Sequence, residues 1–70
     1  MVKILTLMLN SGEELILEQV DSVKVITDDA VINTTARNFF NIGAAERYII
    51  TSSCGHTQLQ RTDIASVVAD

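Results

Sequence analysis

The sequence predicts a small all-β domain, an antiparallel barrel or sandwich of five or six strands. Three observations lead to this class. Apolar side chains make up 47% of the 70 residues, which is enough for one hydrophobic core. Short runs rich in β-branched residues alternate with polar turns along the chain. Neither a Gly/Ser-rich linker nor an internal repeat interrupts them, so residues 1–70 are expected to form a single domain.

Three strands are expected in the first half of the chain. Residues 2–9 are rich in β-forming side chains and end at a polar turn in which Gly12 can adopt a positive φ. Residues 14–20 return from that turn, and residues 23–27 alternate apolar and polar side chains after a further turn. We expect these three strands to form an antiparallel meander. The period of two in the second strand predicts one face with Leu15 and Leu17 and another with Glu14, Ile16 and Glu18.

Residues 29–42 support two interpretations. Four apolar residues recur there at the spacing of one helix face, an Asp precedes them and Gly43 follows, which would give an α+β domain. Residues 31–35 oppose the helix because most of them are β-branched. Together they would make the free energy of helix formation less favourable by about 2 kcal/mol. We favour a strand over residues 31–35 that pairs with the third strand, and a further strand beginning at Phe39.

The last third of the chain predicts three more short strands. Residues 48–51 are apolar and β-branched, and a turn over residues 52–56 follows. Residues 57–60 return from this turn, a one-turn break is expected at residues 61–63, and residues 64–68 form the last strand.

Several predicted strands carry neighbouring apolar residues, which is typical of strands buried on both faces. A 70-residue chain cannot easily cover both faces of a sheet, so closure into a small barrel together with assembly of several copies is expected. The alternative is a monomer with scattered exposed apolar side chains. The candidate interface residues are Leu5, Leu7, Ile49 and Val67.

No catalytic, metal or cofactor site is expected. The single cysteine excludes an internal disulfide, and Cys54 with His56 supplies only two of the four ligands that a structural zinc site needs. The carboxylate pairs lie in predicted turns, and no phosphate-binding loop or nucleophile motif is present, so we do not expect an enzyme. The apolar run over residues 4–9 is too short for a signal peptide or a membrane span, which predicts a cytoplasmic protein with no membrane contact.

The net charge of −4 is concentrated in the first part of the chain. Residues 1–29 contain six acidic and two basic side chains, whereas residues 30–70 contain three of each. An excess of acidic side chains disfavours contact with nucleic acid, because such binding depends on cations that displace counterions from phosphates.

Composition and charge together favour a non-catalytic β module that self-assembles and binds a macromolecular partner, as an adaptor, inhibitor or assembly element. Small viral accessory proteins often work in this way. One alternative is a homo-oligomer that binds a small anionic ligand, such as a nucleotide, at subunit junctions. A second alternative is a small barrel that binds single-stranded nucleic acid through arginines and the aromatic residues Phe39, Phe40 and Tyr48. The candidate ligand-binding residues are Arg37, Arg47, Tyr48, His56 and Arg61.

Overall fold

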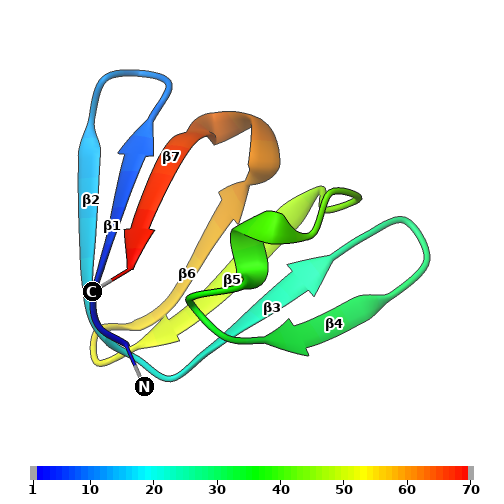
Figure 1. Cartoon of the computed structure of the whole chain (residues 1–70), viewed down its shortest axis with the longest axis horizontal. Coiled ribbons are helices and arrows are strands. Elements are labelled where there is room, and N and C mark those ends of the chain that lie inside the picture. The colour runs from blue at the N-terminus through cyan, green and yellow to red at the C-terminus, as the bar shows by residue number, and fades with distance from the viewer. Residues whose placement is uncertain (1, 70) are drawn as a thin grey trace.

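The computed structural model describes residues 2–69 and contains seven strands and two single-turn 3-10 helices, η1 and η2 (Figure 1). The elements in chain order are β1 (Val2–Leu9), β2 (Glu14–Val20), β3 (Ser22–Ile26), β4 (Val31–Thr34), η1 (Phe39–Asn41), β5 (Arg47–Ser52), β6 (Gly55–Gln60), η2 (Arg61–Asp63) and β7 (Ile64–Ala69). The all-β prediction is confirmed, with more strands than the five or six expected. In the described part of the chain no helix is long and apolar enough to cross a membrane.

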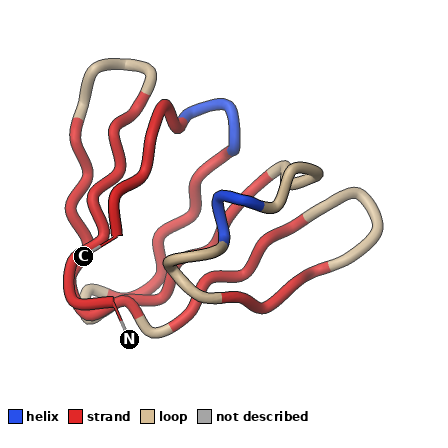
Figure 2. The backbone as a smooth tube through the Cα atoms, viewed as in Figure 1, coloured by secondary structure: helices blue, strands red, loops and turns tan. Residues whose placement is uncertain are grey.

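The strands form two antiparallel sheets that pack as an open sandwich. One sheet has the order β2-β1-β7 and the other the order β4-β3-β5-β6. Figure 2 shows the two strand layers meeting at one end of the molecule and spreading apart at the other. At the closed end the Ser53 amide donates to the Glu18 carbonyl, and the Asp21 amide donates to the Thr51 carbonyl. The sandwich alternative is therefore the observed one, and the sheets do not close into a barrel.

The expected meander is wrong at its third strand. β1 and β2 form a hairpin, but β3 leaves their sheet and pairs with β4 and β5. The chain changes direction at Gln19, which has a φ of +51°. Leu17 and Val20 are both buried, so the alternation of inward and outward side chains shifts by one residue at this point. The side of β2 where β3 was expected is an edge of the three-stranded sheet, and β7 pairs with β1 on the other side.

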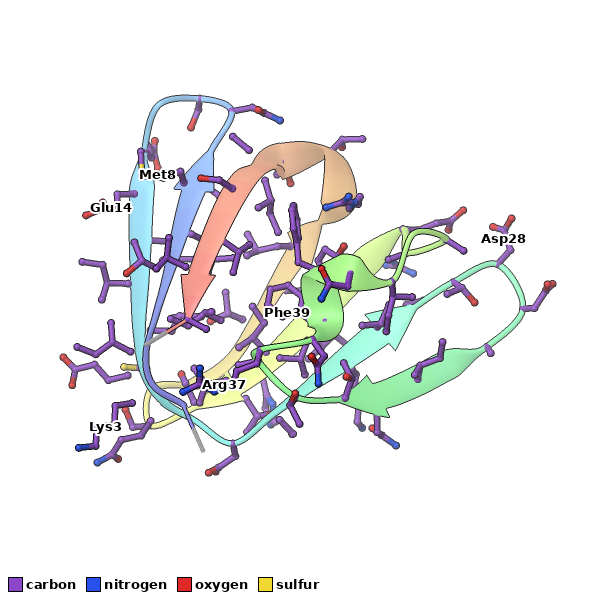
Figure 3. The ribbon with its side chains drawn as sticks, in the orientation of Figure 1. Lys3, Met8, Glu14, Asp28, Arg37 and Phe39 are labelled. Carbon is purple, nitrogen blue, oxygen red and sulfur yellow. The ribbon has the colours of Figure 1, made fainter. Side chains whose placement is uncertain are left out.

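The helix considered for residues 29–42 is absent, because this segment contains a strand and a single 3-10 turn. β4 pairs with β3, as the β-branched residues predicted. A strand at Phe39 is wrong, because this residue begins η1 instead. The amides of Asn38 and Phe39 both donate to the Thr35 carbonyl, which closes the chain into a tight turn. This turn places the Phe39 ring between the two sheets, where the side chain is fully buried (Figure 3).

The core lies between the two sheets and is closed by η1. The rings of Phe39 and Tyr48 pack edge to face, with centroids 4.9 Å apart. Both side chains are fully buried, and such a pair adds about 1 kcal/mol to the stabilisation from burial. The other buried apolar residues are Leu5, Leu7, Leu17, Val20, Val23, Val25, Ala36, Ala45, Ile50 and Ile64.

The last third of the chain follows the sequence prediction. β5 and β6 form a hairpin with a two-residue loop between Ser52 and Gly55, where Gly55 has a φ of +108°. The expected one-turn break is η2, after which β7 crosses to the other sheet. The backbone N–H of Asn10 donates a hydrogen bond to the Asp63 carbonyl at a distance of 2.8 Å. This bond joins η2 to the β1–β2 turn.

Candidate functional site

The outer face of the three-stranded sheet carries a cluster of exposed apolar side chains, here called the apolar face and defined by Ile4, Met8, Ile16 and Val68. Thr6 of β1 lies at its centre, directly between Ile16 of β2 and Val68 of β7. Ile16 is 54% exposed and Val68 is 63% exposed. A contiguous cluster of this kind is typical of an interaction surface rather than of scattered surface residues.

Two carboxylates flank the apolar face along β2. Glu14 lies opposite Met8 and Glu18 lies opposite Ile4, so both share the outer side of the sheet with Ile16. Figure 3 shows Met8 and Glu14 on the side of the sheet that faces away from the core. The faces of β2 are therefore those expected from its alternation, with Leu15 and Leu17 turned inward.

The candidate interface residues lie at different depths. Leu5 and Leu7 are fully buried in the core, and Val67 is half-buried against it. Their outward-facing neighbours form the apolar face instead. Successive side chains of a β-strand face opposite sides of the sheet. In β1 and β7 both sets contain apolar residues, so the sequence alone does not show which set faces the core. Ile49 does lie on an outer surface, half-buried on the four-stranded sheet.

Ile49 lines a shallow hollow of about 430 Å³ on the outer face of the four-stranded sheet. Lys24 of β3 and Gln58 of β6 lie directly on either side of Ile49. Thr51 and His56 lie opposite each other one step along the sheet, and the Thr51 hydroxyl oxygen is 3.0 Å from Nδ1 of His56. The hollow thus has an apolar floor and a rim of cationic and polar side chains.

A second hollow, of about 500 Å³, brings together Arg47 and Arg61. Glu46, Gln60 and Thr62 line it as well. Hydrogen bonding with the Asp28 carboxyl group and the negative charge of that group raise the pKa of Glu46, whereas the charge of Arg47 acts in the opposite direction. The two guanidinium groups could hold an anion, although Glu46 opposes a negative ligand when it is ionised.

The remaining candidate ligand-binding residues do not join this hollow. Tyr48 is fully buried beside Phe39, and His56 belongs to the hollow at Ile49. Arg37 lies just before η1 and lines neither hollow (Figure 3). Of the five residues, the structure therefore brings only Arg47 and Arg61 together in one hollow.

The aromatic side chains offer little surface on which a base could stack. Phe39 and Tyr48 are fully buried, and Phe40 is half-buried beneath the Arg61 guanidinium. Cys54 is exposed in the β5–β6 loop, and no group of three or more potential metal ligands occurs among residues 2–69.

No family model, curated protein or solved structure matches the chain. Of the candidate interface residues named from the sequence, Ile49 lies on an outer surface, whereas Ile4, Met8 and Val68 were not among the candidates. Two signals for the apolar face were present in the sequence, the neighbouring apolar residues of several strands and the alternation in β2, which places Ile16 among glutamates.

Proposed function

We propose that this protein is a non-catalytic β module that self-assembles through the apolar face and, once assembled, binds a macromolecular partner. The exposure of Ile4, Met8, Ile16 and Val68 on one side of one sheet supports this proposal. Burying a side chain of this type is worth about 1.5–3 kcal/mol. A domain of this size gains little from its own core and benefits from such association.

The proposed occupant of the apolar face is a second copy of the chain. Three strands about 4.8 Å apart present a face of only a few hundred Å², whereas a stable interface buries about 800 Å² on each partner. The contact must therefore extend past the apolar side chains to the polar residues around them. Sheets stack face to face at about 10 Å, which would bring these flanking side chains into the interface.

Light scattering over a range of concentrations tests this proposal, with Val68→Lys as the disrupting variant. Ile32→Lys is the control, because Ile32 is 38% exposed on the edge strand β4 and pairs with the buried Val25, on the opposite face of that strand from Lys24 and Ile49. The parent chain and Ile32→Lys should assemble alike, and Val68→Lys should remain monomeric at concentrations where they do. A monomeric parent chain, or a Val68→Lys variant that assembles like the parent, would contradict the proposal.

The partner expected for the assembled protein is a basic macromolecular surface. The net charge of −4 would speed its encounter with such a surface, and assembly would multiply that charge. β4 pairs with β3 on one side only, so its other edge is available for strand pairing. We place the protein in the cytoplasm, where the exposed thiol of Cys54 would stay reduced.

A second candidate function, binding of a small anion, is favoured by the common hollow of Arg47 and Arg61. Its test is the melting temperature in increasing phosphate or nucleotide, which rises if the folded protein binds the ligand. Arg47→Ala should remove the rise, and Arg37→Ala, which changes an arginine outside the hollow, should keep it. A melting temperature that does not respond to either ligand excludes this function.

A further inference from the structure

We propose that the copies associate head to tail, with the apolar face of one copy seated on the hollow at Ile49 of the next. This inference rests on the proposed self-assembly and specifies its geometry. The two surfaces lie on opposite sides of the sandwich, since each is the outer face of a different sheet. A contact between them is heterologous, so its repetition gives a closed ring or an open chain of copies.

Charge complementarity distinguishes this arrangement from the stacking of two apolar faces. Among the described strand residues, the outer face of the three-stranded sheet carries Glu14 and Glu18 and no cation. A symmetric pair of apolar faces would thus bring four carboxylates into one interface, where like charges repel and oppose association. The outer face of the four-stranded sheet carries Lys24, Arg47 and His56 and no carboxylate on its described strands.

The spacing of the two surfaces also matches. On β2, Ile16 lies two residues from Glu14 and two from Glu18, so the carboxylates are about 13 Å apart along the strand. On β5, Ile49 likewise lies two residues after Arg47 and two before Thr51, whose neighbour across the sheet is His56. Both surfaces therefore have an isoleucine at the centre and polar or charged groups about 7 Å to either side.

The shapes of the two isoleucine sites are complementary as well. Ile16 protrudes from its sheet and is 54% exposed, whereas Ile49 is half-buried in a hollow of about 430 Å³. Lys24 stands directly beside Ile49 and exposes its ammonium group to an incoming carboxylate. Seating Ile16 in this hollow buries both isoleucines and brings Glu14 and Glu18 to the cationic rim.

Reversing the charge of each surface in turn tests the arrangement. The first variant is Glu14→Lys with Glu18→Lys, and the second is Lys24→Glu with Arg47→Glu. Each should weaken assembly by about tenfold or more, because like charges then meet at the junction. An equimolar mixture of the two variants should assemble again, since each then presents a charge that suits the other.

Matched controls separate the junction from the effect of net charge. Asp21→Lys with Asp29→Lys changes the net charge as the first variant does, at exposed positions outside the described strands that carry the two surfaces. Lys3→Glu with Arg37→Glu matches the second variant. Both controls should assemble like the parent, and circular dichroism should show that all four variants retain the β fold.

The outcomes distinguish the geometry from the proposed function. Loss of assembly in both charge variants and its return in the mixture supports the head-to-tail junction. A parent chain that forms a fixed dimer, unaffected by Lys24→Glu with Arg47→Glu, overturns the junction and leaves self-assembly through the apolar face intact. A parent chain that is monomeric at every concentration overturns both.

Discussion

The guanidinium carbon of Arg61 lies 3.9 Å from the centroid of the Phe40 ring, so the cation covers one face of the aromatic side chain. Phe40 in turn lies beside Phe39 and Tyr48, at centroid distances of 6.0 and 6.4 Å. Arg61 therefore links η2, at the end of β6, to the aromatic cluster that closes the core. The sequence separates Arg61 from Phe40 by twenty residues, and only the tertiary fold brings them together.

Replacing Arg61 with Ala should lower the free energy of unfolding by about 1 kcal/mol, because a cation over an aromatic face contributes about this much at a partly exposed site. Arg61→Lys should retain part of the effect, since the ammonium group lacks the planar stacking surface of the guanidinium. Urea denaturation measures the difference. Arg37→Ala is the control, and an Arg61→Ala variant as stable as that control would show that the contact contributes nothing.

Tyr48 carries the one buried side-chain polar atom without a hydrogen-bond partner among the described residues, its hydroxyl oxygen. Tyr48→Phe should therefore raise the free energy of unfolding by about 1 kcal/mol, because it removes a desolvated group and keeps the ring against Phe39. Thermal or urea unfolding tests this. Reduced stability of Tyr48→Phe would indicate that the hydroxyl accepts a hydrogen bond from the nearby Arg61 guanidinium.

The same hydroxyl should make stability depend on alkaline pH. Burial raises the pKa of Tyr48, and the nearby positive charge of Arg61 only partly opposes that effect. The folded chain then holds the phenolic proton at a pH where the unfolded chain has lost it. Stability should fall as the pH rises past the ordinary tyrosine value of about 10. In Tyr48→Phe this part of the decline should disappear, and equal pH profiles for the two chains would contradict the burial argument.

Glu46 should titrate at a higher pH than an isolated glutamate, because hydrogen bonding with Asp28 and the charge of that residue raise its pKa. The contribution of Glu46 to stability is then present below its unfolded pKa and is lost as the pH rises through its folded pKa. Asp28→Asn removes the charge and should lower the pKa of Glu46. NMR titration of the Glu46 carboxyl carbon measures this directly, with Asp29→Asn as the control.

The sequence was sufficient for the fold class and for most strands, because these depend on local alternation and turn residues. Residues 31–34 form a strand as their β-branched side chains indicated. The prediction that β3 lies in the sheet of β1 and β2 was wrong. Consecutive strands usually pair, and the sequence gives no sign of the change of chain direction at Gln19. The strand expected at Phe39 was also wrong because of a tertiary contact. Phe39 is buried by packing against Tyr48, and no local sequence pattern shows this contact.

The candidate site was less predictable than the fold. The sequence named Ile49 as an interface candidate, and its part in an interface stays a prediction. The residues of the apolar face depend on which of the two alternating sets of side chains in β1 and β7 points inward. The packing of the whole core determines which set points inward, and there Leu5 and Leu7 are fully buried. Arg47 and Arg61 share a hollow because β5 and β6 pair in a register that places Gln60 opposite Arg47. No local pattern encodes either relationship.

Gln19 has a backbone conformation that few residues other than glycine adopt without strain. This residue is the one non-glycine with a positive φ among residues 2–69, and a β-branched side chain is strongly disfavoured there. Gln19→Val should lower the free energy of unfolding by about 1–2 kcal/mol, whereas Gln19→Gly should be tolerated because glycine adopts this conformation without steric cost. Gln58→Val is the matched control, since Gln58 is an exposed glutamine on a regular strand where valine is favourable. Equal stabilities for the two valine variants in urea would show that the reversal at Gln19 imposes no strain on a branched side chain.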